Sequence, residues 1–278
     1  MTSSSDPNEG GEAGSHPVDR AELVHEARKA IKRMRALARL LRYELGEREF
    51  ERVNSSLRAA GQRLAGARDA EVRLATLQRL RTRHPKALAL EGIERLSEQL
   101  ERERKQASEP TPPRDVLADI ADMRRHLARW NLVEHDFEAL APGLKRIYRE
   151  GRRRYARVKR EHARNAEHVH DWRKRVKSLY YALDMLGGAS AKGTRDVTRR
   201  AERLGDVLGE EHDLWMFAAY LQEHPEAFGE DTSAHEALLK LTERRRERLR
   251  ERALELGARL YELGAGDFTR RIGNVLAR

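Results

Sequence analysis

The chain has 278 residues, of which 39% are hydrophobic and 37% are charged, and its formal net charge is +10. It contains no cysteine, which excludes disulfides, thiolate catalysis and cysteine-ligated metal centres. No apolar run is long enough to form a transmembrane helix, so we expect a cytoplasmic protein without a membrane partner.

Residues 1–18 are polar and rich in Gly and Ser, with no apolar segment of the kind found in signal peptides, and we expect them to be a disordered tail. Residues 19–278 are rich in the helix formers Ala, Leu, Arg and Glu and poor in β-branched and aromatic residues. Their apolar positions recur with a helical period, which predicts an all-α fold. We expect helices at 19–45, 48–65, 67–83, 86–107, 114–131, 134–164, 167–186, 192–209, 211–223, 231–263 and 267–277.

A sequence repeat divides this helical region. VHEARKAIK, which contains His25, matches VHDWRKRVK, which contains His170, and LAGARD further along matches LGEEHD at nearly the same offset. Two matches in the same order and at nearly one spacing indicate an internal repeat. We therefore predict two homologous halves, approximately 19–131 and 132–278, each a small helical bundle and related by a pseudo-two-fold axis.

The first repeat begins with a basic stripe. On a helical wheel the apolar residues after Val24 share one face, and an adjacent stripe at i+3/i+4 spacing contains no acid. This stripe consists of His25, Arg28, Lys32, Arg35, Arg39 and Arg42. Like charges at this spacing destabilise a helix by a few tenths of a kcal/mol per pair, so the stripe predicts an anionic partner.

The second repeat has a shorter stripe, formed by His170, Arg173 and Lys177, with Tyr180 in the position that corresponds to Arg35. Residues 145–160 add a third basic segment. If that segment packs antiparallel to 167–186, the two place their cations in one groove. A lone basic segment is more often a solvated face, as at 243–252, where regularly spaced acids neutralise the arginines and we assign no function.

These segments resemble the CHAD domain, a conserved histidine α-helical domain. The resemblance is carried by VHEARKAIKRMRALARLLR, AGQRLAGARDAEV, GLKRIYREGRRRYARVKR, VHDWRKRVKSLYYALDML and LGDVLGEEHDLWMF. It implies two four-helix bundles with pseudo-two-fold symmetry and a basic cleft that binds inorganic polyphosphate, without catalysis, cofactor or metal. It also implies an association with polyphosphate granules.

The binding candidates combine the positions carried over from the family with the rest of the two stripes. We leave open whether Lys29 joins the groove or faces water. The candidates are His25, Arg28, Lys29, Lys32, Arg35, Arg39, Arg42, Arg149, Arg153, His170, Arg173, Lys174, Lys177 and Tyr180. Arginine offers phosphate two parallel hydrogen bonds and lysine a point charge, so these residue types suit a polyanion.

Two other functions remain open. A helical nucleic-acid-binding protein would also place cations against phosphates, and other polyanions are alternative partners. A metal-dependent phosphohydrolase could use the His-Asp pairs at 135–136, 170–171 and 212–213. Against the hydrolase, His212 corresponds to Arg68 in the repeat, and arginine does not ligate metals. The sequence does not indicate an oligomeric state.

Overall fold

The computed structural model describes residues 20–64, 68–107, 114–128, 137–187 and 193–277. The tail expected at 1–18 therefore lies outside the described residues. The described part is all helical, as predicted, and contains no strand. Its helices are α1 (Arg20–Leu40), α2 (Arg42–Leu45), α3 (Glu47–Arg63), α4 (Arg68–Arg83), α5 (Glu91–Gln106), α6 (Arg114–Ala128), α7 (Phe137–Arg160), α8 (Ala166–Met185), α9 (Arg195–Glu223), the 3-10 helix η1 (Pro225–Phe228), α10 (Thr232–Leu260) and α11 (Ala265–Leu276).

The ends of most helices shift by a few residues from the expected ones, and at two places the division into helices differs. The expected helix 19–45 is interrupted at Leu41, where a bend separates α1 from α2. The helices expected at 192–209 and 211–223 form the single helix α9, which continues through Gly209. A glycine inside a helix costs only about 1 kcal/mol relative to alanine, which burial of Leu208 and Leu214 on either side easily offsets.

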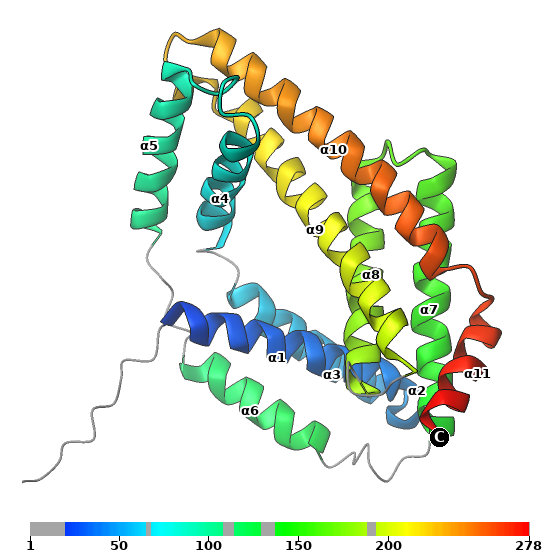
Figure 1. Ribbon diagram of the computed structural model, residues 1–278. Coiled ribbons are helices and arrows are strands. Elements are labelled where there is room, and N and C mark those ends of the chain that lie inside the picture. The colour runs from blue at the N-terminus through cyan, green and yellow to red at the C-terminus, as the bar shows by residue number, and fades with distance from the viewer. Residues whose placement is uncertain (1–19, 65–67, 108–113, 129–136, 188–192, 278) are drawn as a thin grey trace, which may run out of the picture.

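The buried apolar side chains form two clusters. The larger cluster joins α1, α3, α6, α7, α8 and α11 with the first half of α9 and the end of α10. The smaller cluster joins α4, α5 and η1 with the second half of α9 and the first part of α10. In Figure 1, α4 and α5 accordingly lie beside the upper parts of α9 and α10, away from α6.

Each cluster therefore contains helices from both predicted halves, because α4 and α5 pack with α9 and α10. The long helices α9 and α10 pass from one cluster into the other and connect them. The pseudo-two-fold relation between the halves stays a prediction. Among the described helices, none is both long and apolar enough to cross a membrane.

Candidate polyanion-binding surface

Helix α1 presents the first basic stripe beside its buried face. Ala27, Ile31 and Met34 are buried, and each is followed directly in the sequence by a residue of the stripe, so the stripe runs beside the buried face. His25 and Lys32 are exposed, whereas Arg28, Arg35, Arg39 and Arg42 are partly buried. The stripe thus changes along the helix from solvated to partly desolvated cations.

Several of these arginines donate to neutral acceptors. The Arg28 guanidinium donates to the carbonyl of Leu64, the residue that caps the C-terminus of α3. Such terminal carbonyls lack intrahelical partners and favour cations. Arg35 Nε donates to Asn54 Oδ1 at 3.3 Å, and Arg39 Nη1 donates to the Arg35 carbonyl at 3.1 Å.

Two residues of the first repeat are matched by acids. Lys29 Nζ lies 3.4 Å from Glu26 Oε1, near the surface. Arg42 pairs with Glu47 and also lies over the Phe50 ring, 4.1 Å from its centroid. The Arg42 contacts hold α2 against the start of α3, and both pairs reduce the positive charge near the stripe.

Arg35 and Arg39 lie among further arginines. Burial, followed by the charges of Arg58 and Arg175, lowers the pKa of Arg35. Burial, followed by Arg35 and Arg175, lowers the pKa of Arg39 to about 10, against the opposing effect of Glu150. We call Arg35, Arg39, Arg58 and Arg175 the arginine cluster.

The arginine cluster includes two residues that sequence reasoning missed. Arg58 comes from α3, which packs beside α1, and Arg175 comes from α8. Arg175 was present in the repeated motif, but the helical wheel places it off the stripe of its own helix. Only the crossing of α1 and α8 brings it to Arg39.

The second repeat presents its stripe to α9, where acids meet it. Lys177 Nζ lies 3.0 Å from Asp206 Oδ1, and the Tyr180 hydroxyl donates to Glu202 Oε1 at 3.4 Å. Burial, followed by Glu202, raises the pKa of Tyr180 to about 12, so the hydroxyl remains a donor at neutral pH. Lys174 pairs at 3.1 Å with Asp171 on its own helix.

Helix α7 packs antiparallel to α8, since Glu150 contacts Arg175 at 3.0 Å and Glu161 contacts His168 at 2.5 Å. From the sequence, we expected a shared cationic groove if these two helices packed antiparallel. They do pack antiparallel, but the side chains that meet between them include acids as well as cations. Arg149 and Arg153 are exposed, and helical periodicity places them opposite the buried residues of α7. They therefore lie outside the contact between α7 and α8.

Among the described residues, the His-Asp pairs considered for metal binding do not form a set of metal ligands. His135 and Asp136 lie outside the described residues, Lys174 binds Asp171, and Arg79 of α4 lies 3.7 Å from Asp213. Within the ranges that the structure describes, no group of three His, Asp or Glu side chains could hold a metal ion.

His170 and His212 instead stack on one another between α8 and α9. Their ring centroids are 4.2 Å apart and their planes differ by 29°. The Trp215 ring lies beside both, 5.5 Å from His212 and 6.2 Å from His170. Sequence reasoning placed His170 among the polyanion-binding candidates but considered His212 only as part of a His-Asp pair for metal binding.

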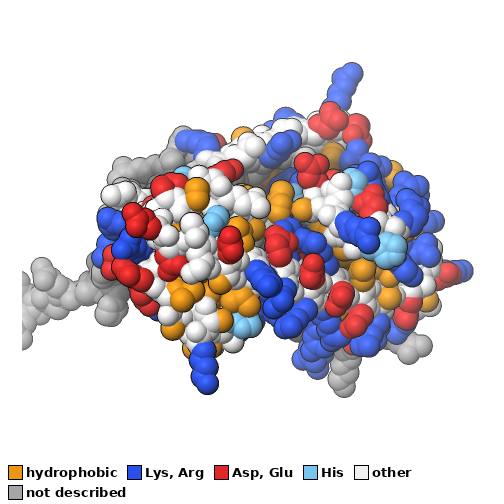
Figure 2. All heavy atoms as spheres, turned by 90° about the horizontal axis from the view of Figure 1, so that it is seen from above, with side chains coloured by type: hydrophobic (Ala, Val, Ile, Leu, Met, Phe, Trp, Pro, Cys, Tyr) orange, Lys and Arg blue, Asp and Glu red, His pale blue; other side chains and the backbone are white. Residues whose placement is uncertain are grey.

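A surface view shows how far acids balance the cations. On the face shown in Figure 2, Lys and Arg side chains are interspersed with Asp and Glu. On this face, the cations therefore do not form a uniform coat.

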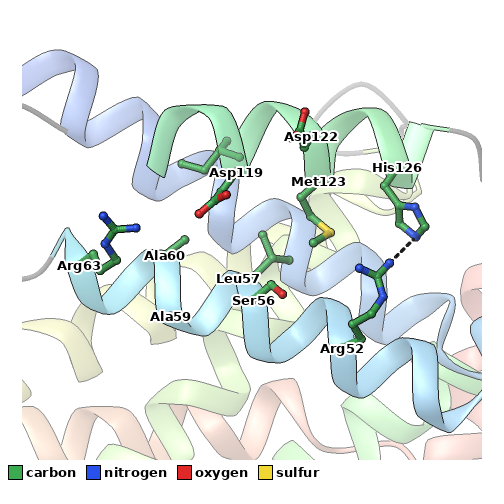
Figure 3. Close-up of a pocket in the computed structure, with 11 residues that line it drawn as sticks. Arg52, Ser56, Leu57, Ala59, Ala60, Arg63, Asp119, Asp122, Met123 and His126 are labelled. Atoms are coloured by element: carbon green, nitrogen blue, oxygen red, sulfur yellow. Dashed lines mark hydrogen bonds between the residues drawn. The ribbon is translucent and has the colours of Figure 1, made fainter. Parts of the chain in front are cut away.

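A pocket of about 390 Å³ lies between α3 and α6. Figure 3 shows Arg52 and His126 meeting at one end of this pocket and Arg63 at the other. Arg52 Nη2 and His126 Nε2 are 3.2 Å apart, and both side chains also bind Glu49. Asp119 and Asp122 line the same pocket, so its charges are mixed and none of the predicted binding residues line it.

Comparison with known proteins gives one match. The family model of the CHAD domain matches residues 12–222, well over half of the chain. Neither the curated proteins nor the solved structures contain a match.

Proposed function

The chain belongs to the CHAD domain family, and from this premise we propose that it binds inorganic polyphosphate on the surface formed by α1, α3 and α8, without catalysing a reaction. The arginine cluster carries the proposal. Four arginines from three helices approach one another there, and the acceptors of Arg35 and Arg39 are neutral oxygens. Glu150, which pairs with Arg175 at 3.0 Å, offsets only part of their charge. Crowded, partly desolvated cations are unfavourable unless an anion joins them.

Polyphosphate has the chemistry that such a surface requires. It is a flexible chain with about one negative charge per phosphate and no bases or rings. Guanidinium groups can bind its oxygens in pairs, and release of counterions from the chain adds affinity that falls with salt, as it does for nucleic acids.

The predicted residues divide into two groups in this proposal. Lys29, Arg42, Lys174 and Lys177 each have a carboxylate partner, which a phosphate must displace or share. The side chains of Arg35 and Arg39 donate to neutral oxygens, so a phosphate can bind them without displacing a carboxylate from either side chain. We therefore expect the arginine cluster to contribute more affinity than the second stripe, with the exposed His25 and Lys32 extending the path.

The internal repeat belongs to the same proposal. Both repeats place a histidine-led basic helix against the helix that follows it: α1 against α3 and α8 against α9. The central helices of the two copies, α1 and α8, contact each other, with Arg33 of one 3.1 Å from Asp184 of the other. We propose that the halves are related by a pseudo-two-fold axis that passes between these helices, and that polyphosphate binding localises the protein to granules in the cytoplasm.

The decisive measurement is polyphosphate affinity after two charges are removed from the arginine cluster. Arg35→Gln with Arg39→Gln should weaken binding by at least about tenfold, because each lost charged hydrogen bond costs roughly 1.5–3 kcal/mol. The matched control is Arg244→Gln with Arg248→Gln, which removes the same charge from exposed positions on α10. Equal losses in both variants would mean that net charge, and not this surface, binds the polymer.

A second pair of variants tests the lysines of the two stripes. Lys32→Glu with Lys177→Glu should lower affinity more than Arg244→Glu with Arg248→Glu. Arg245 is unsuitable as a control because both Nε and Nη2 bind Glu210 at 3.0 Å, so its replacement would disturb the contact between α9 and α10.

Competition and turnover assays address the alternatives. Double-stranded DNA that displaces polyphosphate at equal phosphate concentration would favour a nucleic-acid-binding function. Release of orthophosphate from polyphosphate in the presence of Mg²⁺ or Mn²⁺ would contradict the non-catalytic proposal.

A further inference from the structure

The stacked histidines between α8 and α9 lie among charged groups from several helices. On α8 they are flanked by Arg173 and Lys174, and both cations act on His212. The acids nearby are already engaged: Asp171 pairs with Lys174, and Asp213 lies near Arg79 of α4. Asp171 favours a charge on the His170 ring, but its effect is smaller than the opposing effects of burial, Lys174 and Arg173.

Within the described residues, no acid of the other neighbouring helices acts on the two rings. Arg154 of α7 acts on Asp171, and Arg245 and Arg246 of α10 bind the two glutamates that precede His212. Helix α1 meets α8 on its other side, where Arg39 faces Arg175. Among the described residues, the charges that act on the two histidines are thus mainly positive, and Asp171 is the opposing charge at His170.

Both rings are consequently neutral in the free protein at neutral pH. Burial, followed by Arg173 and His170, lowers the pKa of His212 to about 3. Burial, followed by Lys174 and Arg173, also lowers the pKa of His170. Nδ1 of each ring is buried and has no hydrogen-bond partner among the described residues, so each ring retains an unused polar atom.

We propose that His170, His212, Arg173 and Lys174 form a proton-coupled phosphate subsite, in which binding of a polyanion adds one proton to the histidine pair. This inference rests on the proposed polyanion binding and deepens it. Phosphates placed against Arg173 and Lys174 replace a positive surrounding with a negative one, which favours an imidazolium. The stack accommodates one such charge, because an imidazolium over a neutral ring gains cation–π attraction while two stacked cations repel.

Linkage fixes the direction of the pH dependence. The bound state has the higher histidine pKa and therefore holds more protons, so affinity rises as pH falls through that pKa. Terminal phosphates of the ligand act in the opposite sense, since a cationic site lowers their pKa and releases protons. Net proton uptake on binding therefore means that the protein, and not the ligand, takes up the proton.

Calorimetric titration of the full chain with polyphosphate of defined length, in two buffers of different ionisation enthalpy, measures this proton. We expect net uptake near pH 6.5 and an affinity roughly fivefold to tenfold higher at about pH 5.5 than at about pH 8. His170→Gln with His212→Gln should lose both the proton uptake and most of the rise in affinity between about pH 8 and about pH 5.5. His84→Gln, at the end of α4, is the matched control and should behave as the unaltered protein.

Three outcomes separate the two proposals. Binding without proton uptake by the unaltered protein overturns the subsite and leaves polyphosphate binding standing. Unchanged uptake in the double variant does the same, because other groups must then take the proton. Absence of binding at every pH overturns the proposed function itself. If the double variant does not fold, His212→Gln alone must still reduce the uptake, and undiminished uptake overturns the subsite.

Discussion

Single residues decide how closely the helices around the arginine cluster approach each other. A Cβ added to Gly143 of α7 would lie 2.1 Å from the Leu40 carbonyl oxygen and 2.8 Å from that of Arg39. The backbone of α7 therefore touches the end of α1, and only glycine permits this contact. The same close approach keeps Arg39 near Glu150 of α7.

We expect Gly143→Ala to destabilise the protein by about 1–3 kcal/mol, because the two backbones must separate to admit the methyl group. Gly209→Ala is the control within α9, where an added Cβ meets nothing within 4 Å. It should stabilise the protein by about 0.5–1 kcal/mol through the unfolded state. Urea denaturation measures both, and equal effects of the two substitutions would contradict the close contact.

Pairs of elements are joined by charges that are buried inside the fold. Glu211 of α9 is 2% exposed, and its Oε1 accepts hydrogen bonds from Arg246 Nε at 3.3 Å and Arg250 Nε at 3.0 Å. The arginine-rich segment 243–252 is thus balanced partly by α9, beyond the acids of its own helix that the sequence indicated. This segment works as a structural contact, in agreement with the absence of an assigned function.

Removal of Glu211, the acid that Arg246 and Arg250 share, should weaken the contact between α9 and α10. We expect Glu211→Ala to cost about 3–5 kcal/mol, because it leaves Arg246 buried without that carboxylate. Glu247→Ala, at an exposed position of α10, should change the free energy of unfolding by less than about 0.5 kcal/mol. A small loss in the first variant would mean that Glu243, which also binds Arg246, suffices to balance it.

Across the whole molecule, the two apolar clusters predict regions of unequal stability. Leu96 belongs to the smaller cluster with α4 and α5, and Leu57 belongs to the larger cluster with α1 and α3. The arginine cluster lies on the larger one. A substitution in the smaller apolar cluster should therefore reduce the affinity for polyphosphate less than a substitution in the larger apolar cluster.

Hydrogen exchange measures this difference. Leu96→Ala should cost about 2–5 kcal/mol and lower amide protection mainly in α4 and α5, whereas Leu57→Ala should lower it mainly in α1, α3 and α6. Uniform loss of protection in both variants would show that α9 and α10 couple the clusters into one cooperative unit.

Much of this arrangement was determined by the sequence alone. Composition and a 3.6-residue period predicted the all-helical fold, and the wheel of residues 24–45 separated the buried face of α1 from its basic stripe. The repeated histidine motif indicated the family, which the family model then showed. These features are local, since periodicity depends only on residues within one helix.

Tertiary structure decided which cations meet acids and which also meet other cations. Lys177 meets Asp206, Arg33 meets Asp184, and Arg175 joins Arg39 only because separate helices pack together. His212 reaches His170 for the same reason. Contacts between helices depend on how their buried faces fit, and no period within a single helix contains that information. The sequence therefore specified the stripe, while packing specified its net charge and its additional members.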